Sequence, residues 1–186
     1  MKPIFTAIIL VSLCFFSCQN PSKLEQLLAC ESSETFRFDK TSTDFNKTFS
    51  IQNYKKWKTN LYYDEYQSSI MIADTTKALD KTFIFEIAMY DGELNFTAAF
   101  NAGLKAKIEQ NNLELVEENY FKWQDKPAYY SRSKGIKNKR NYQELNIYIN
   151  HEPTRYLKAQ IQVYGDQNIQ ERFCSSLQLF TTLKIK

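Results

Sequence analysis

The spacing of apolar and polar positions changes several times along the chain, and each change marks a candidate element. Short apolar or alternating runs, which are typical of strands, recur after residue 47. The strand candidates are residues 48–52, 61–74 (one or two strands), 81–90, 113–123, 126–134, 141–150 and 155–164. The later candidates follow one another through short polar links, so the pattern predicts antiparallel meanders.

Three other segments have apolar residues at helical spacing. They are residues 22–31, residues 95–112 and a C-terminal segment that starts at Asp166 or Asn168. Ser22 and Asn95 are candidate N-caps. The order of short helix, strands, helix, strands and helix predicts an α+β fold. We expect an antiparallel sheet of about six to seven strands flanked by helices, an α/β/α sandwich, forming a single domain over residues 48–186.

The first eighteen residues differ from the rest of the chain. The run from Ile4 to Phe16 is almost entirely apolar and has the length of a secretory signal rather than of a membrane span. Ser17 followed by Cys18 resembles the lipobox of bacterial lipoproteins. This resemblance implies a signal peptide at residues 1–17 and lipidation of Cys18 with palmitate-type chains. An ordinary cleaved signal with an incidental cysteine is the alternative.

Lipidation would fix the location of the protein. The acyl chains on Cys18 would hold it on a membrane without a spanning helix. Residues 18–47 would then comprise the anchor, the short helix and a connecting segment over 31–47. The residues just after Cys18 carry no acidic cluster of the kind associated with surface export. We therefore expect a protein of the bacterial cell envelope, on the outer membrane and facing the periplasm.

Composition excludes several functional classes. The 186 residues include 24 Lys plus Arg and 21 Asp plus Glu, and this near balance argues against a nucleic-acid partner. Aromatic residues make up 15% of the chain, which favours a sheet-rich fold. A single histidine leaves too few ligands for a zinc or iron site, so we expect no metal and no cofactor.

Two cysteines remain after the signal and the lipidation site are set aside. Cys30 and Cys174 form an even pair in an oxidising compartment, which predicts a disulfide between the two ends of the domain. Two separate buried thiols are the alternative. Catalytic signals are weak: His151 lies beside Glu152, but we expect these neighbours to point apart on an exposed turn. We therefore expect no enzyme.

The order of several motifs resembles the PsbP-like domain family. FSIQNYKKWK at residues 49–58 resembles the start of these domains, although Tyr54 stands at the usual proline position. Residues 126–129 are similar to a turn into a family strand but lack its glycine, and residues 173–177 are similar to the end of its terminal helix. The resemblance covers residues 48–180. It implies an antiparallel sheet between helices, a role in binding or assembly, and no catalytic residue.

Outward-facing aromatics and a basic hairpin supply the candidate contact surface. The candidate partner-binding residues are Tyr62, Tyr66, Tyr129, Tyr130, Lys137, Lys139 and Arg140. We expect a membrane-anchored, non-enzymatic module that binds or assembles with an unknown protein partner. The alternative is a binder of a small apolar or carbohydrate ligand between helix and sheet. A flat exposed aromatic patch would favour the first function, and an apolar pocket of about 300 Å³ or more would favour the second.

Overall fold

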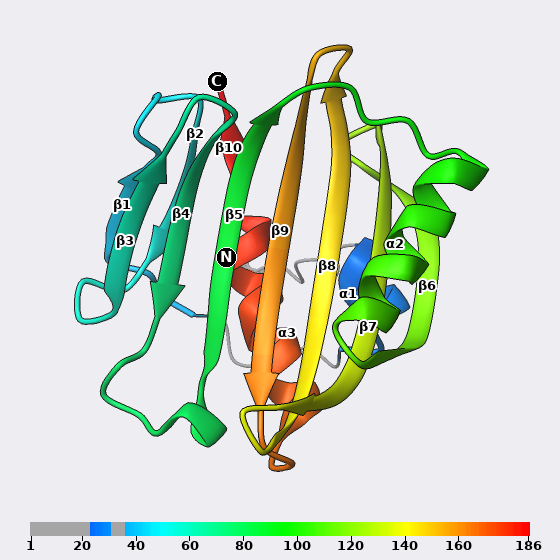
Figure 1. The fold of residues 1–186 in the computed structure, drawn as a ribbon. Coiled ribbons are helices and arrows are strands. Elements are labelled where there is room, and N and C mark those ends of the chain that lie inside the picture. Colours follow the sequence, from blue (N-terminus) through cyan, green and yellow to red (C-terminus); the bar gives the residue numbers. More distant parts are fainter. Residues whose placement is uncertain (1–22, 31–35) are drawn as a thin grey trace, which may run out of the picture.

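The computed structural model describes residues 23–30 and 36–186, so the predicted signal peptide, the Ser22 cap and the lipidation site Cys18 lie outside the described residues. A large antiparallel sheet has the strand order β3-β4-β5-β9-β8-β7-β6 (Figure 1). Its strands are β3 (Lys58–Tyr63), β4 (Gln67–Ala73), β5 (Phe83–Asp91), β6 (Leu113–Trp123), β7 (Lys126–Lys137), β8 (Arg140–Glu152) and β9 (Arg155–Tyr164). The seven strands confirm the predicted sheet.

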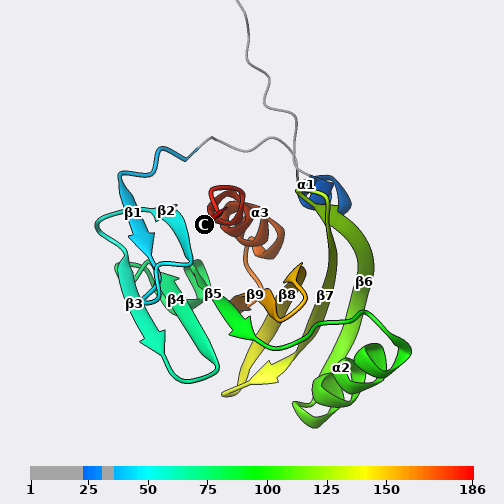
Figure 2. The ribbon, with the colours of Figure 1, turned by 90° about the horizontal axis from the view of Figure 1, so that it is seen from above.

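Helices cover both faces of this sheet. The helical elements are α1 (Lys23–Leu27), α2 (Ala98–Gln110), α3 (Ile169–Thr181) and a short 3-10 helix, η1 (Leu79–Lys81). Figure 2 shows the sheet curving around α3, with α1 on the same side and α2 on the opposite face over β6 and β7. The predicted α+β class is therefore confirmed. Within the described residues, no helix has the length and apolar character needed to cross a membrane.

A second, three-stranded sheet was not expected. It has the order β1-β2-β10 and consists of β1 (Lys40–Thr43), β2 (Phe49–Asn53) and β10 (Lys184–Ile185). β1 lies in the segment that the sequence assigned to a connection, because its residues are polar and show no apolar alternation. The buried Asp44 carboxylate closes the turn after β1 by accepting hydrogen bonds from the Phe49 amide at 2.8 Å and the Ser68 hydroxyl at 2.8 Å.

Of the two long helices, α2 begins later than predicted, whereas α3 begins at its N-cap Asn168, one of its two predicted starts. α2 starts two residues later than expected for an Asn95 cap, because the Thr97 side chain accepts the hydrogen bond from the Phe100 amide at 3.3 Å. α3 follows Asn168, whose side chain makes no capping bond. Instead the buried Arg172 anchors the start of α3, donating from Nη1 to the carbonyl oxygens of Thr82 at 3.1 Å and Tyr164 at 2.8 Å.

Side chains on the central strands alternate between an apolar inner face and a polar outer face, as the pleat of a strand requires. Phe85, Ile147 and Ile161 on the inner face are fully buried and belong to one core cluster with α3. The corresponding outer positions carry polar side chains such as Glu144 and Gln160. Each buried large apolar side chain contributes about 1.5–3 kcal/mol, so the inner face determines how the sheet and α3 assemble.

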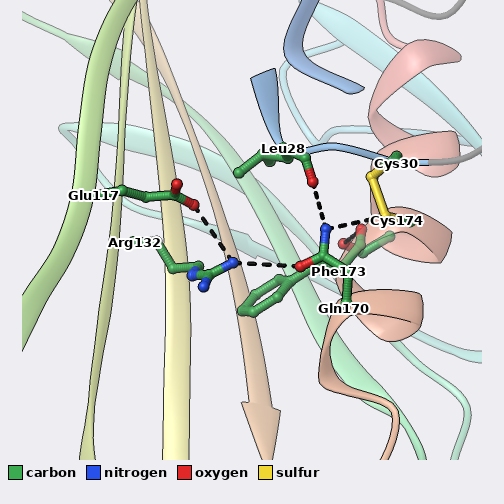
Figure 3. Close-up of a disulfide and its surroundings, with 8 residues drawn as sticks. Leu28, Cys30, Glu117, Arg132, Gln170, Phe173 and Cys174 are labelled. Atoms are coloured by element: carbon green, nitrogen blue, oxygen red, sulfur yellow. Dashed lines mark hydrogen bonds and ion pairs between the residues drawn. A yellow bond between two sulfur atoms is a disulfide. The ribbon is translucent and has the colours of Figure 1, made fainter. Parts of the chain in front are cut away.

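A disulfide joins the N-terminal helix to the C-terminal one. Cys30 just after α1 is bonded to Cys174 of α3, with 5.5 Å between their Cα atoms, as the sequence predicted (Figure 3). Gln170 of α3 reinforces this junction, because its amide nitrogen donates to the Leu28 carbonyl oxygen and its side-chain oxygen accepts from Arg132 Nη1 at 3.4 Å. The junction therefore connects α1, α3 and β7.

Loss of the disulfide should destabilise the domain without changing its fold. The bond closes a loop with a sequence separation of 144, for which the chain-entropy model gives about 4–5 kcal/mol, with measured values often lower. We expect the paired substitution Cys30→Ala and Cys174→Ala to lower the free energy of unfolding by about 2–5 kcal/mol in urea denaturation. Reduced wild-type protein should match the variant. An unchanged urea midpoint after reduction would contradict this prediction.

Candidate functional site

Large apolar side chains are exposed together at one corner of the sheet. The aromatic corner consists of Phe45, Leu61, Tyr62, Tyr63 and Tyr66, which are 62%, 47%, 45%, 56% and 65% exposed, respectively. They come from the turn between β1 and β2, from β3, and from the turn between β3 and β4. The Phe45 and Tyr63 rings stack at 4.9 Å between centroids. The structure thus exposes two predicted contact residues, Tyr62 and Tyr66, in the same hairpin as Leu61 and Tyr63, with Tyr62 on the opposite face of the edge strand from Leu61 and Tyr63.

Local hydrogen bonds hold the aromatic corner in place. Asp64 accepts from the backbone amides of Tyr66 at 2.8 Å and Gln67 at 3.0 Å, which fixes the turn that presents Tyr66. The bond from the Tyr66 amide is also the main reason that the pKa of Asp64 lies below its usual value. Asn60 donates to the Tyr62 hydroxyl at 3.2 Å. The corner therefore has a defined geometry.

The aromatic corner lies on an edge of the large sheet. β3 is the terminal strand and pairs with β4 on one side only. Within the described residues no strand pairs with the other side of β3, although side chains of the small sheet reach it: Lys40 of β1 and Asn53 of β2 donate to the Thr59 hydroxyl at 3.2 and 2.8 Å. An edge strand has backbone groups that can pair with another chain.

Two of the predicted contact residues are not on the surface. Tyr129 and Tyr130 are 0% and 3% exposed, so their assignment to a partner surface is wrong. Tyr129 packs under α2 against Phe100, with 5.3 Å between ring centroids, and its hydroxyl donates to the Glu118 carboxylate. Tyr130 points to the opposite face and joins the core cluster of α3. Both faces of β7 are covered here, so alternation exposes neither ring.

The predicted basic residues lie far from the aromatic corner. Lys137, Lys139 and Arg140 are exposed on the tight hairpin between β7 and β8, where Lys137 pairs with Arg140. Register places this hairpin beside the Tyr164 end of β9, whereas the aromatic corner is near the Tyr156 end. The predicted aromatic and basic candidates therefore do not form one surface.

A pocket that sequence analysis did not locate lies between α2 and the outer face of the sheet. It has a volume of about 360 Å³. Leu104 and Ile108 of α2 form one wall, and the opposite wall is mostly polar, including Glu144 of β8 and Lys158 of β9. The pocket is in the helix–sheet position expected for the ligand-binding alternative, but its lining is polar rather than apolar.

Glu144 is the centre of a hydrogen-bond network at the base of this pocket. Its carboxylate accepts from the Tyr142 hydroxyl at 2.8 Å, the Asn146 amide at 3.0 Å and the Gln160 amide at 3.2 Å. Burial, together with the nearby Glu144 charge, raises the pKa of Tyr142, so its phenol stays protonated and donates this bond. The Ser133 hydroxyl donates a fourth bond to the carboxylate at 3.4 Å. All four partners are neutral donors, which satisfy the carboxylate oxygens without neutralising the charge.

His151 and Glu152 are closer than expected. The sequence indicated that they would point apart, but His151 Nε2 lies 3.3 Å from a Glu152 oxygen. A register irregularity in β8 between Asn150 and Glu152 breaks the regular alternation at this point. Glu152 also accepts two bonds from Arg155, at 2.7 and 3.0 Å, which link β8 to the start of β9. Within the described part of the chain, no group of three or more His, Cys, Asp or Glu residues is placed to hold a metal.

Comparison with known proteins identifies the fold. No protein-family model matches the chain, and no curated protein matches its sequence. The solution structure of cyanobacterial PsbP (CyanoP) from Synechocystis sp. PCC 6803 is similar, with a TM-score of 0.56, 7% identity, and coverage of 84% of this chain and 97% of that one. The chain therefore has a PsbP-like fold.

A second similar structure comes from Bacteroides thetaiotaomicron VPI-5482. This crystal structure has a TM-score of 0.50 and 15% identity, and the match covers 81% of this chain and 49% of that one. The matched part thus spans about half the length of the Bacteroides protein. At these identities the two comparisons concern the fold alone.

The environment of His151 gives a pH-dependent prediction. Burial lowers the pKa of His151 below 6.5, while Glu152 acts in the opposite direction. The folded state favours the neutral form of His151. His151 therefore contributes to the free energy of unfolding above about pH 6.5, and this contribution decreases as the pH falls towards the pKa of the folded state. Titration of the single histidine ring by NMR should therefore give a midpoint below 6.5.

The same titration in the Glu152→Gln variant provides the control. Removing the carboxylate that raises the His151 pKa should lower the midpoint further. The wild-type protein unfolded in urea should titrate near the ordinary histidine value. A folded midpoint at or above that of the unfolded protein would show that burial does not dominate.

Proposed function

We propose that this protein is a lipid-anchored module of the bacterial cell envelope that binds a protein partner through the aromatic corner and catalyses no reaction. The observation that carries this proposal is the clustering of Phe45, Leu61, Tyr62, Tyr63 and Tyr66. These account for five of the eight large apolar side chains that are exposed within the described residues. Single exposed apolar residues are ordinary, but five of them at one edge strand and its neighbouring turns, on both faces of that strand, are a feature of a contact surface.

The lipid anchor rests on the N-terminal sequence and on cysteine usage. A signal-like apolar run ends at Ser17 and Cys18, the arrangement that resembles a lipobox. The Cys30–Cys174 bond is consistent with an oxidising compartment such as the periplasm. Acyl chains on Cys18 would hold the domain on the outer membrane, facing the periplasm.

The chemistry of the aromatic corner favours a protein partner. Tyrosine and phenylalanine are enriched at protein interfaces, where they bury large areas at a small entropic cost. The corner also lies on the edge strand β3, to which an extended segment of a partner can add through backbone hydrogen bonds. We propose that the partner supplies such a segment and that the exposed rings of Tyr62 and Tyr66 provide side-chain specificity.

A test of the partner site uses crosslinking at two matched positions. A photoreactive residue at position 66 or 136 is introduced into the lipidated protein in native membranes; Tyr66 is 65% and Ile136 68% exposed. Position 136 lies on β7 close to the basic hairpin, away from the aromatic corner. Position 66 should give one defined crosslinked product with a protein, and position 136 should not. Equal crosslinking at both positions, or none at position 66, would contradict the proposal.

Substitutions should weaken the same interaction. The double variant Tyr62→Ser and Tyr66→Ser should capture the crosslinked partner at least about tenfold less well, as expected when interface aromatics are truncated. Ile136→Ser is the control for loss of an exposed apolar side chain and should capture the partner normally. Both variants should melt near the wild-type temperature, because the removed side chains are exposed. Equal loss of capture in both variants would refute the assignment.

The anchor is tested separately. Cys18→Ser should move the protein from the membrane fraction to the soluble fraction, since no acyl chain can then be attached. Mass spectrometry of the wild-type N-terminus should show Cys18 as the first residue with its lipid. A membrane-bound Cys18→Ser protein would refute the anchor without bearing on the partner site.

A further inference from the structure

Three lysines from three different elements line the pocket between α2 and the outer face of the sheet. Lys107 comes from α2, Lys137 from the end of β7, and Lys158 from the middle of β9. They are separated by at least twenty positions in the sequence, so their convergence is a property of the fold. The pocket contains one acidic side chain, Glu144, which leaves a lining with three positive charges and one negative charge.

Lys158 lies where burial makes a charged ammonium group unfavourable. It is half-buried on a central strand of the sheet, with Ala88 of β5 and Tyr148 of β8 as its neighbours in register. Its ammonium lies 5.8 Å from the centre of the Tyr148 ring. Burial and the nearby Lys107 lower the pKa of Lys158. A cation in this position is stabilised when an anion shares the site.

No carboxylate of the described residues is in ion-pair contact with Lys158, although the more distant charges of Glu144 and Glu86 partly oppose the lowering of its pKa. Within the described residues, none of Lys107, Lys137 and Lys158 forms an ion pair with a carboxylate. Lysines just outside the pocket behave differently. Lys105, two positions before Lys107, lies 3.4 Å from Glu118, and Lys134 lies 3.4 Å from Glu114. These two neighbouring lysines are thus ion-paired, whereas the three that line the pocket are not.

The other polar side chains of the pocket determine which hydrogen bonds a ligand could form there. The Glu144 oxygens are occupied by Tyr142, Asn146 and Gln160. In contrast, the Tyr148 hydroxyl and the Asn111 side-chain oxygen form no hydrogen bond with another described residue, although both residues line the pocket. A hydroxyl group on a ligand can bond to either of them.

We infer that this pocket binds a small organic anion that carries a carboxylate or phosphate next to hydroxyl groups, as in an acidic or phosphorylated monosaccharide. The anionic group would lie between the three lysine ammonium groups, and the hydroxyls would bond to Tyr148 and Asn111. The volume of about 360 Å³ is near the lower limit for small-molecule sites, which favours a compact ligand. This inference concerns a site separate from the aromatic corner and does not depend on the proposed partner.

Calorimetry with matched ligands tests the inference. The full lipidated protein in detergent is titrated with glucuronate, glucose 6-phosphate, glucose and inorganic phosphate at millimolar concentrations. We expect one-to-one binding of glucuronate or glucose 6-phosphate. Glucose should bind more weakly by about tenfold or more, because it lacks the charged group that would form hydrogen bonds with the lysines. Comparing the two sugar anions identifies which anionic group is preferred. Phosphate alone should bind less tightly than the preferred sugar anion, because it cannot reach the hydroxyl-binding groups.

Variants distinguish the pocket from a general charge effect. Lys158→Met removes the charge but keeps an unbranched side chain only one atom shorter, and it should weaken binding of the preferred anion by about tenfold or more. Lys107→Gln changes an exposed residue of α2 and should weaken binding in the same direction without risk to the core. Lys105→Gln removes the same charge from the same helix but outside the pocket, and should leave binding unchanged.

Three outcomes would overturn the inference. The first is that neither sugar anion binds, and the second is that glucose binds as tightly as they do. The third is that Lys105→Gln weakens binding as much as Lys107→Gln, which would indicate general attraction to a basic surface. Thermal unfolding of each variant shows whether it is folded, so loss of binding in folded Lys107→Gln protein supports the site even if Lys158→Met is unstable.

Discussion

The alternation of side chains along β5, β9 and β8 is the constraint on which the rest of this molecule depends. Inward positions such as Ile87 and Ile161 are fully buried against the layer that contains α3, and outward positions such as Gln160 are polar. A shift of one residue in register would exchange the two sets. It would place the Glu144 network under α3 and leave the apolar side chains in water. The buried inner face therefore fixes the polar outer face and, with it, the arrangement of the pocket.

The pocket exists because α2 covers only part of that outer face. Leu104 and Ile108 of α2 pack with Tyr129 and Tyr148 in a small separate core. Beyond this core the outer face becomes polar, and the pocket lies at the boundary. A helix that covered all of β8 and β9 would bury the Glu144 network and displace the lysines. The same boundary explains why one side of the pocket is apolar and the other charged.

The sequence predicted element boundaries correctly where the pattern of a single strand or helix determines them. The limits of β6 and β9 were predicted to the residue because both strands end at turn-forming residues. The prediction of exposed residues failed where helices cover both faces of one strand. Tyr129 and Tyr130 are both buried because β7 is covered on both faces. β1 was missed because its alternation is polar. One signal for the pocket was available, since Lys158, Gln160 and Gln162 alternate with buried residues in a strand that lies inside the sheet.

α1, the first described element after the proposed anchor, and the inferred pocket lie on opposite faces of the sheet. If Cys18 carries lipid, the five residues from it to Lys23 reach at most about 17 Å when fully extended, so α1 must lie close to the membrane surface. α1 packs in the core on the inner face, whereas α2 is on the outer face (Figure 2). The pocket is lined by residues of α2 and of that outer face. A protein held through α1 would thus direct the pocket away from its own membrane. This orientation favours a dissolved anion over a lipid headgroup of that membrane as the ligand, and it leaves the aromatic corner free at the edge of the sheet.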